Sequence, residues 1–447
     1  MSGPPLSDQD HASYHMSTRT APAIAGDGAP DLDLSPDDLH SIIDQSLATV
    51  GPGARVLAII PDKTRDDNTD LLFPFASQAL AAKRAAVFDA LVAQGTHPPM
   101  TEDEKRSKIG AQNGEMPLPG SIHDHKWDDP GALTTLGELS AERVREITGG
   151  LLQQSIPLRV NRLLARGVYD VVLIFGSTMP HEVAGFSGGA KYFFPGVAGP
   201  ELTHATHWLS ALATVEHTIG RIETPVRHLI EAAADHVPAQ VISLNSVVNR
   251  GDDGRLRTYG LFAGGFREGF RKACEVSRQV HIRYTGRKYK RVVALLDEHY
   301  DDLWVGGKAS YRLGAVIEDS GELLIYAPHL LRISETHGRL IEQYGYAPLE
   351  KVRVLVDHSE DLQANLCVAA HLAHVAYAGR LQPDGEILPR FRITMATRID
   401  EETCRRVNLG FMDYRTFNRA DYEGDPDTLV VERAGRDLYL VSHSAGD

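Results

Sequence analysis

Apolar runs separated by longer mixed segments mark the first half of the chain. RVLAIIP at 55–61 and DVVLIF at 170–175 are almost wholly apolar, and each runs straight into a polar loop. Such runs are typical of strands that are buried on both faces of a parallel sheet. We expect a helix over about 78–93 between them. Strands that alternate with helices predict an α/β domain with a mostly parallel sheet.

The first helix is predicted from its capping signal. In SPDDLHSIIDQSL, Ser35 is placed to cap the helix and Pro36 lies in its first turn. Residues 1–35 are rich in Ser, Pro, Asp, Gly and Ala and have no hydrophobic period, so we predict a disordered tail there. The N-terminal domain is expected over 36–285.

The second half repeats the α/β pattern. RVVALLDEHY, ELLIYAP, KVRVLVD and FRITMAT predict four strands, at 291–300, 322–328, 351–357 and 391–397. LGAVIEDSG at 313–321 predicts a helix, and together these elements predict a second domain over 286–426.

The C-terminal segment DTLVVERAGRDLYLV predicts a hairpin with Gly435 at its turn. One arrangement returns residues 427–447 to the first domain. The fold class that follows is α/β, with two α/β domains, mostly parallel sheets and the active site in the cleft between them.

Length and charge narrow the class of protein. A chain of 447 residues is long for one compact domain, so two domains are the default. Its 46 Lys and Arg residues and 60 Asp and Glu residues give a net charge of −14, which argues against nucleic acid or an anionic membrane as the main partner. No run reaches the roughly 18 apolar residues of a membrane span, and we expect a cytoplasmic protein. The three scattered cysteines predict neither a disulfide framework nor a zinc ribbon.

Three polar loops follow predicted strands and should meet at one edge of the sheet. They are PDKTR at 61–65, QGTHPP at 94–99 and MPHEVAGFSGGAK at 179–191. In parallel α/β sheets, ligands bind at the carboxyl ends of the strands. We therefore expect the functional site where these loops converge.

The glycine-rich loop around Lys191 is not a loop that binds a nucleoside triphosphate. A Walker loop needs a Ser or Thr after its lysine to hold magnesium, and Tyr192 stands there instead. The largely apolar segment YFFPG that follows Lys191 indicates that the lysine amine is partly desolvated, and a desolvated amine tends to be nucleophilic. We interpret the segment as a ligand site, although a tight turn with a solvated lysine would also use glycines.

Four histidines occupy or follow these loops: His97, His181, His204 and His207. An isolated histidine is most often structural, but several at one sheet edge suggest chemistry. Two can form an acid/base pair, and a third can bind a metal such as nickel or zinc. The sequence lacks HExxH and a Cys/His finger, which gives a zinc hydrolase little support.

These motifs together resemble the lactate racemase family, whose enzymes use a nickel-pincer nucleotide. The matching segments are PDKTR, GTHPP, HEVAGFSGGAKYFFPG and THATH, at 61–65, 95–99, 181–196 and 203–207, with Lys308 in WVGGK as a looser match. The resemblance extends from about Ala54 into the second domain and is most specific in the first.

The resemblance implies a covalently attached cofactor, a pyridinium mononucleotide with two sulfur arms and a nickel ion. It implies that Lys191 is the point of attachment and that His207 completes the nickel coordination. Further cofactor contacts are implied for Asp62, Lys63, Thr64, Arg65, Ser187, Gly188 and Gly189. Cofactor-synthesis proteins are implied as partners.

The implied reaction is racemisation or epimerisation at C2 of a 2-hydroxy acid. His97 and His181 are implied as the catalytic acid/base pair on opposite sides of the substrate, while hydride moves between C2 and the cofactor. Arg65 and Lys308 are implied to bind the substrate carboxylate.

Two departures from the family pattern bear on the substrate. A glutamine that helps to bind lactate corresponds to about Val305, and the pocket tryptophan is missing from the segment near 362–367. A larger or sugar acid is therefore favoured over lactate, and polar residues near the second domain's mouth are candidates to bind it: Asp301, Asp302, Asn408, Asp413 and Tyr414.

Two other functions remain open from the residues. One is a lyase that uses Lys191 as a Schiff base without metal. The other is a non-catalytic protein that binds a hydroxy acid or a nucleotide.

Overall fold

The larger of two main sheets has seven strands. The computed structural model describes residues 23–442 except 112–117, 119, 252 and 299. The strand order is β1-β11-β10-β7-β2-β3-β4. The strands from β10 to β4 are parallel to one another, β11 is antiparallel to β10, and the edge strand β1 is antiparallel to β11. The bounds are Ala25–Gly28 (β1), Arg55–Pro61 (β2), Val87–Ala93 (β3), Ile122–His123 (β4), Val171–Ser177 (β7), Gln240–Arg250 (β10) and Leu256–Gly264 (β11).

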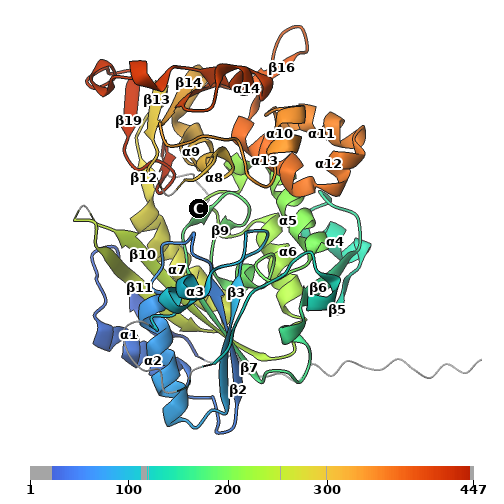
Figure 1. Cartoon of the computed structure of the whole chain (residues 1–447), viewed down its shortest axis with the longest axis vertical. Helices are drawn as coiled ribbons and strands as arrows, with labels where there is room; N and C mark the ends of the chain where they lie inside the picture. Colours follow the sequence, from blue (N-terminus) through green and yellow to red (C-terminus); the bar gives the residue numbers. More distant parts are fainter. Residues whose placement is uncertain (1–22, 112–117, 119, 252, 299, 443–447) are drawn as a thin grey trace, which may run out of the picture.

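Helices cover both faces of this sheet (Figure 1). Val56, Ala58 and Ile60 pack with α1 and α2, whereas Leu57 and Ile59 point the other way towards α5 and α6. This alternation explains why β2 is apolar at nearly every position. The helices are α1 (Pro36–Ser46), α2 (Thr69–Ala82), α3 (Glu102–Lys108), α4 (Ala141–Ile147), α5 (Pro200–Ala213), α6 (Pro225–Ala234) and α7 (Phe266–His281).

The smaller sheet has five parallel strands in the order β18-β17-β14-β13-β19. Their bounds are Tyr289–Leu295 (β13), Ile317–Ala327 (β14), Arg392–Thr397 (β17), Gly410–Phe411 (β18) and Thr428–Val431 (β19). The helices of this half are α8 (Leu303–Gly306), α9 (Lys308–Leu313), α10 (Gly338–Tyr344), α11 (Leu349–Asp357), α12 (Glu360–Ala364), α13 (Leu366–Ala376) and α14 (Glu401–Arg406).

Four two-stranded pairings complete the described chain. They are β5 (Leu133–Leu139) with β6 (Ile156–Asn161), β8 (Pro180–His181) with β9 (Gly185–Phe186), β15 (Gly379–Leu381) with β16 (Ile387–Pro389), and β12 (Ile282–Tyr284) with β20 (Leu438–Leu440). Within the described residues, no helix is both long enough and apolar enough to span a membrane.

The α/β fold class with mostly parallel sheets is confirmed. So is the first helix: Ser35 Oγ accepts a hydrogen bond from Asp38 N at 3.2 Å, and Pro36 occupies the first turn. The strands expected at 55–61 and 170–175 are β2 and β7.

The helix expected over 78–93 is wrong. α2 ends at Ala82, and Val87–Ala93 form the strand β3. A polar residue inside VFDALVA obscures the strand pattern, but Asp89 is satisfied there because its carboxylate accepts from Ser121 N at 2.7 Å and from Tyr169 Oη at 2.7 Å. Pro74, which we did not place in a helix, lies inside α2.

Two predictions in the second half are also wrong. The helix expected over 313–321 is wrong, because residues 317–321 begin β14; the rest of β14 confirms the strand expected at 322–328. Ser320, with a left-handed backbone, and the adjacent Gly321 lie where the pairing with β13 is irregular. KVRVLVD forms the helix α11, where a strand was expected. Val352 and Val356 are buried four positions apart, while Val354 is 58% exposed, so the burial follows a helical period.

The predicted C-terminal hairpin does not form. β19 pairs in parallel with β13 of the smaller sheet, and β20 pairs in parallel with β12, which follows α7. Gly435 does turn the chain, with a φ of 91°. The domain limits at 36, 285 and 426 remain predictions.

The predicted disordered tail over 1–35 is wrong for its last part. β1 adds to the edge of the large sheet through Gly26 and Gly28, which lie against β11 so closely that a Cβ at Gly26 would stand 1.9 Å from Leu261 O. Because β1 has the sequence AGDG and joins the sheet mainly through its backbone, its sequence shows no hydrophobic period that would predict a strand. Residues 1–22 lie outside the described part of the chain.

Candidate active site

Three polar loops meet above the ends of adjacent parallel strands. Pro61 at the end of β2 pairs with Ala93 at the end of β3, and β2 also pairs with β7. The loops that follow these strands, together with α8, α9 and α13 of the other half, enclose a cavity of about 130 Å³. The cavity thus lies between the two main sheets, as the sequence predicted.

Most of the predicted site residues line this one cavity. They are Asp62, Thr64, Arg65, His97, His181, Lys191, His207 and Lys308. These side chains come from parts of the sequence up to 246 residues apart (62 to 308). The sheet topology therefore brings together an amine, three imidazoles and two further cations.

Four predicted contact residues do not line the cavity. Lys63 is exposed and pairs with Glu104 at 2.8 Å. Ser187 donates to the backbone carbonyl of Ser177 at 2.7 Å, so its hydroxyl is used within the loop. Gly188 and Gly189 are not among the residues that line the cavity.

The glycines serve the packing of the loop. Gly188 and Gly189 adopt left-handed φ values of 95° and 57°. A Cβ at Gly188 would stand 2.6 Å from Thr178 Oγ1, and one at Gly189 would stand 3.2 Å from Phe270 Cβ. Any larger residue would push the loop away from α7 and displace Lys191.

A buried arginine that the sequence did not single out supports the same loop. Arg227 is 0% exposed, and it donates to the carbonyls of Phe186 at 2.5 Å and Gly188 at 3.2 Å. Its guanidinium stacks 3.9 Å above the Phe270 ring. Burial lowers the pKa of Arg227 to about 10.

Lys191 is held as an unusually acidic ammonium group. Burial lowers its pKa to about 7, and the positive charge of Arg65 adds to the effect, while the carboxylate of Glu182 opposes it. A substantial fraction of the amine is therefore neutral near pH 7. A neutral amine is the nucleophilic form.

His97 is oriented by a buried carboxylate. Its Nδ1 lies 2.5 Å from Asp62 Oδ2, and Asp62 is 4% exposed. Burial by itself raises the pKa of Asp62, but the hydrogen bond and charge of His97 outweigh it and the net pKa is lowered. Thr64 donates to the other carboxylate oxygen through N at 3.0 Å and Oγ1 at 2.6 Å. With Nδ1–H donated to Asp62, Nε2 of His97 carries a lone pair.

His181 has the opposite tautomer. Its Nδ1 accepts the backbone N–H of Val183 at 3.1 Å, so the neutral ring carries its proton on Nε2. Burial, followed by the positive charges of Lys191 and Arg65, lowers the pKa of His181 well below its usual range. One histidine of the pair therefore presents an acceptor and the other a donor.

His207 has one ring nitrogen bonded to the protein and the other free of hydrogen bonds to the described residues. Its Nδ1 donates to the carbonyl of Thr203 at 2.7 Å, one helical turn earlier in α5, which leaves Nε2 for a ligand. Burial lowers its pKa to about 4, so the ring is neutral at pH 7. Across the described ranges, no cluster of three or more His, Cys, Asp or Glu residues is arranged to hold a metal ion.

The second half contributes wall residues that the sequence reasoning missed. Trp304, Tyr311, His371 and His374 line the cavity. Residues 362–367 contain no tryptophan, and the tryptophan that lines the cavity is Trp304, next to Val305 in α8. Two histidines three positions apart in the apolar helix LCVAAHLAHVA were the available signal for the α13 residues.

Another missed residue is Glu182, which lines the same cavity. Burial by itself raises the pKa of the Glu182 carboxyl. The charge of Lys308 and a backbone hydrogen bond lower it by more than burial raises it, so the net pKa is below its usual value. Glu182 is thus an anion in the same cavity as Lys191 and Lys308, and its charge partly offsets theirs.

The polar residues proposed for a larger substrate lie outside the cavity lining. Asp302 caps α8 through Val305 N at 3.2 Å, Asn408 donates to Tyr346 O at 3.1 Å, and Asp413 pairs with Arg415 at 2.8 Å. Asp301 and Tyr414 do not line it either. His204 faces Trp127 with ring centroids 6.2 Å apart.

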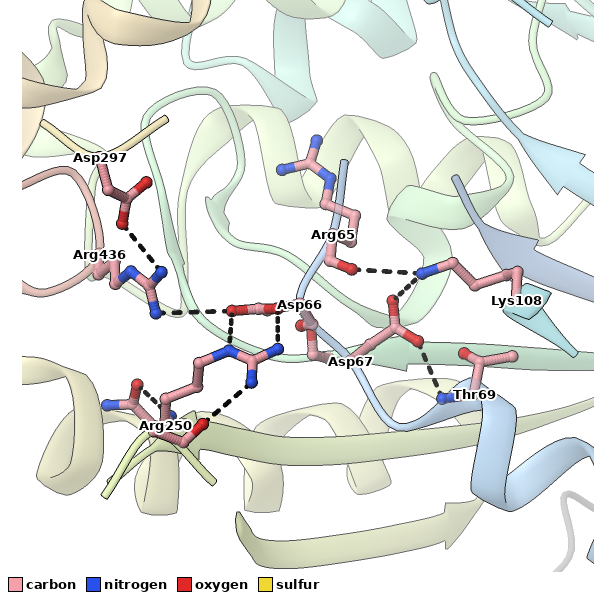
Figure 2. A network of polar contacts seen from close by, with 11 residues as sticks. Arg65, Asp66, Asp67, Thr69, Lys108, Arg250, Asp297 and Arg436 are labelled. Atoms are coloured by element: carbon pink, nitrogen blue, oxygen red, sulfur yellow. Dashed lines mark hydrogen bonds and ion pairs between the residues drawn. The ribbon is translucent and has the colours of Figure 1, made fainter. Parts of the chain in front are cut away.

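A polar network holds the loop that carries Arg65 (Figure 2). Lys108 Nζ donates to Arg65 O at 3.2 Å and to Asp67 Oδ2 at 2.8 Å, and Asp67 Oδ1 accepts from Thr69 N at 2.9 Å. The guanidinium of Arg65 points away from this network. The backbone is fixed while the side chain remains available to the cavity.

The same network connects the two sheets. Arg436 pairs with Asp297 at 2.9 Å and lies 3.6 Å from Asp66, which is also held by Arg250 at 2.8 Å (Figure 2). Arg312 of α9 donates to the carbonyl of Pro180, directly before His181, at 2.9 Å. The two walls of the cavity are therefore tied together beside the catalytic candidates.

Known proteins similar to this chain share one family. The model of the lactate racemase N-terminal domain matches residues 39–220. Lactate racemase of Thermoanaerobacterium thermosaccharolyticum is 25% identical over 231 residues, which are 50% of this chain. That match spans 48%, about half, of the curated relative.

Two solved structures share the fold. The crystal structure of a Thermotoga maritima protein is 32% identical, with a TM-score of 0.82 over 91% of this chain and 99% of that one. The lactate racemase apoprotein of T. thermosaccharolyticum is 16% identical, with a TM-score of 0.67 over 93% of this chain and 100% of that one.

Proposed function

This chain belongs to the lactate racemase family, and from that premise we propose that it is an isomerase that inverts C2 of a 2-hydroxy acid. The observation that carries the proposal is the pair of imidazoles with opposite tautomers, His97 and His181, in one cavity with two cations. Inversion requires an acid/base group for each enantiomer, because the hydroxyl is presented to a different side.

The residues present fit the nickel-pincer nucleotide that the resemblance implies. Lys191 offers a largely neutral amine for attachment, and His207 offers one unencumbered nitrogen to the nickel. Because the described residues supply no three-ligand cluster, the other donors must come from the bound group, as in a pincer. When it is bound, this group supplies the acceptor and donor for the C2 hydride.

The carboxylate of the substrate has a natural place between Arg65 and Lys308. Burial, followed by the positive charge of Arg65, lowers the pKa of Lys308 to about 8. Arg65 and Lys308 repel each other in this small cavity, and the carboxylates of Glu182 and Asp62 offset that repulsion only in part. A substrate carboxylate relieves that repulsion and is held in place by its attraction to both cations.

The two histidines then handle the proton of the substrate hydroxyl. His97 Nε2 takes it from one enantiomer, and the resulting imidazolium is stabilised by Asp62. His181 returns a proton from its Nε2–H to the same oxygen after C2 is restored on its other face. His181 then regains a proton from solvent as His97 releases one, and for the opposite enantiomer the two roles exchange.

Cofactor loading tests the proposal. Protein co-produced with cofactor-synthesis proteins should contain near-stoichiometric nickel and a mass increase on the peptide with Lys191. Lys191→Ala should lose the attached group, and His207→Ala should lose nickel but keep the nucleotide. Equal nickel and nucleotide in Lys191→Ala would contradict the proposal.

The low pKa of Lys191 also suits a Schiff-base lyase, which is the second candidate. That reaction forms an imine between Lys191 and a carbonyl substrate, and borohydride would trap it. Trapping in protein that carries no nickel, together with turnover, would favour the lyase over the isomerase.

A further inference from the structure

The smaller sheet borders a second cavity at the amino ends of its strands. This cavity has a volume of about 490 Å³, and its lining includes Lys290 and Arg291 in the first residues of β13 and Arg392 at the start of β17. The candidate active site lies at the other end of this sheet, because α8 follows the carboxyl end of β13. The two cavities share no lining residue within the described part of the chain. The hairpin that contains β16 also borders the second cavity, and Figure 1 shows it at the end of the molecule remote from the larger sheet.

The lining of the second cavity combines apolar surface with an excess of cations. Phe391, Leu388 and Leu409 supply part of the apolar surface. Small-molecule sites typically have volumes of roughly 300 to 1,000 Å³ and combine apolar walls with a few polar groups, and this cavity matches that type of site. Its charged lining residues are four cations and one carboxylate, in a chain whose net charge is −14: Lys290, Arg291, Arg380, Arg392 and Glu322.

Glu322 balances only one of the two arginines beside it. Its carboxylate pairs with Arg291 Nε at 2.9 Å and with Arg392 Nη2 at 2.8 Å, because the three residues are in register across β13, β14 and β17. Burial by itself raises the pKa of Glu322, but the hydrogen bonds that its carboxylate accepts outweigh burial, and the net pKa is lowered. Lys290 is already paired with Asp427 at 2.7 Å. The two arginines and the ionised Glu322 therefore keep one positive charge in excess.

Arg380 adds a second positive charge that lacks a counter-ion. Its guanidinium makes no ion pair or hydrogen bond with any described residue, and the side chain is only partly buried. Arg380 lies opposite Leu388 in the hairpin of β15 and β16, so the two side chains share a face, and both residues line the cavity. The adjacent Leu381 belongs to the other face, does not line the cavity and is 70% exposed. The charge of Arg380 is thus on the cavity side of the hairpin.

We propose that this second cavity binds a small organic dianion with an apolar body, either a dicarboxylate or a phosphate monoester. Arg380 matches one negative charge, and the excess charge of Arg291 and Arg392 matches the other, since guanidinium groups suit carboxylate and phosphate alike. Phe391 and its apolar neighbours contact the body of the ligand. Because the cavity is separate from the candidate active site, this binding does not depend on the proposed isomerase reaction.

Two dianions that each carry a benzene ring test the proposal. Phthalate and phenyl phosphate are titrated calorimetrically into the full chain at pH 8, and benzoate is the matched monoanion. We expect at least one dianion to bind with a Kd below about 1 mM and about 10-fold or more tightly than benzoate. Tighter binding of phthalate would identify a carboxylate ligand, and tighter binding of phenyl phosphate would identify a phosphate ligand.

Two substitutions each remove one of the two unmatched charges. Arg380→Met should weaken the dianion by about 10-fold or more and leave benzoate much less affected. Arg392→Met should also bring the dianion close to the affinity of benzoate, because Glu322 then neutralises Arg291 completely. Glu322 remains paired in this variant, since Arg291 and Thr394 still donate to it at 2.9 Å and 2.7 Å.

Two control substitutions exclude other sources of binding. Arg405→Met removes an exposed arginine of α14 that pairs with Glu401 at 2.6 Å and does not line the cavity. Lys308→Met removes a cation from the candidate active site. Both variants should bind the dianion as the unmodified protein does.

The outcomes decide the proposal in either direction. It is overturned if neither dianion binds, if benzoate binds as tightly, or if Arg405→Met weakens binding as much as Arg380→Met does. Binding that is lost in Lys308→Met and kept in Arg380→Met would assign the anion to the active site and also overturn it. If a melting curve shows that Arg380→Met does not fold, the exposed position of Arg392 on β17 decides the question through Arg392→Met.

Discussion

At the scale of single residues, the site depends on which atom of each histidine is already used. Asp62 takes Nδ1–H of His97, the backbone of Val183 donates to Nδ1 of His181, and the carbonyl of Thr203 takes Nδ1–H of His207. In each ring one nitrogen is committed to the protein. In our proposal the other nitrogen acts as acceptor in His97, donor in His181 and metal ligand in His207.

Replacing the carboxylate that orients His97 should impair catalysis without removing the cofactor. Asp62→Asn should lower kcat by roughly 10²- to 10⁴-fold, because the imidazolium loses its counter-charge and Nδ1 loses its acceptor. Nickel content and the mass of the Lys191 peptide, measured on the same sample, should stay unchanged. Undiminished kcat would show that His97 is not an acid/base group.

The lowered pKa of Lys191 predicts a pH-dependent stability of the cofactor-free protein. Its pKa is about 7 in the folded protein against an ordinary 10.5. Between these values the unfolded chain binds more protons, so the contribution of Lys191 to the free energy of unfolding rises with pH across this window. Lys191→Met lacks this contribution, and its stability advantage should be largest below pH 7 and shrink towards pH 9.

Urea unfolding at pH 6 and pH 9 measures that difference. Lys272→Met, at an exposed position of α7, is the control and should show no such trend. An advantage of Lys191→Met that is the same at both pH values would mean that the amine is not desolvated in the fold.

At the scale of elements, a strand end and a short helix jointly place Arg65. Lys108 at the end of α3 holds Arg65 O and Asp67, and Asp67 in turn accepts from Thr69 N at the start of α2. Asp67 is almost fully buried, with its side chain 1% exposed, so this contact is poorly screened by water. The loop between β2 and α2 is fixed at both ends.

Lys108→Met should therefore loosen the proposed carboxylate site. We expect KM for the acid to rise about 10-fold with a smaller change in kcat, because ground-state binding is affected more than the proton transfers. Lys108→Arg should restore most of the affinity. Lys105→Met is the matched control: Lys105 is also buried on α3, but it pairs with Asp124 and Glu102. An equal rise in KM in both variants would mean that α3 is merely destabilised.

Some strands and helices of the fold could be predicted from the sequence, and others could not. β2 and β7 are buried on both faces, so their apolar runs identify them and place the loops that carry Asp62 and His181. β3 contains Asp89, a polar residue whose carboxylate accepts hydrogen bonds and which interrupts the apolar run. α11 has valines at every second position, as a strand would, but buries Val352 and Val356, which are four positions apart. Such patterns are ambiguous until the neighbouring elements are known.

The α13 wall was missed for a related reason. A helix that is buried all round has no amphipathic period, and its histidines look like core residues. Only the three-dimensional arrangement shows that His371 and His374 face the cavity that Lys191 and His207 approach from the other side.

At the scale of the whole molecule, the two sheets form opposite walls of one site. The larger sheet brings the amine, the three imidazoles and Arg65, and the smaller half brings Lys308 and the wall around Trp304. Arg436 and Arg312 connect the halves close to Asp66 and to the residue before His181.

The most direct measurement follows the C2 hydrogen during inversion. Single enantiomers from a panel of 2-hydroxy acids and aldonates are incubated in ²H₂O with nickel-containing protein, and C2 is observed by ¹H NMR. Our account predicts that the configuration of at least one acid inverts while its C2 proton is retained, because the hydrogen never exchanges with solvent. Deuterium appearing at C2 at the rate of inversion, or no inversion of any acid by fully loaded protein, would contradict it.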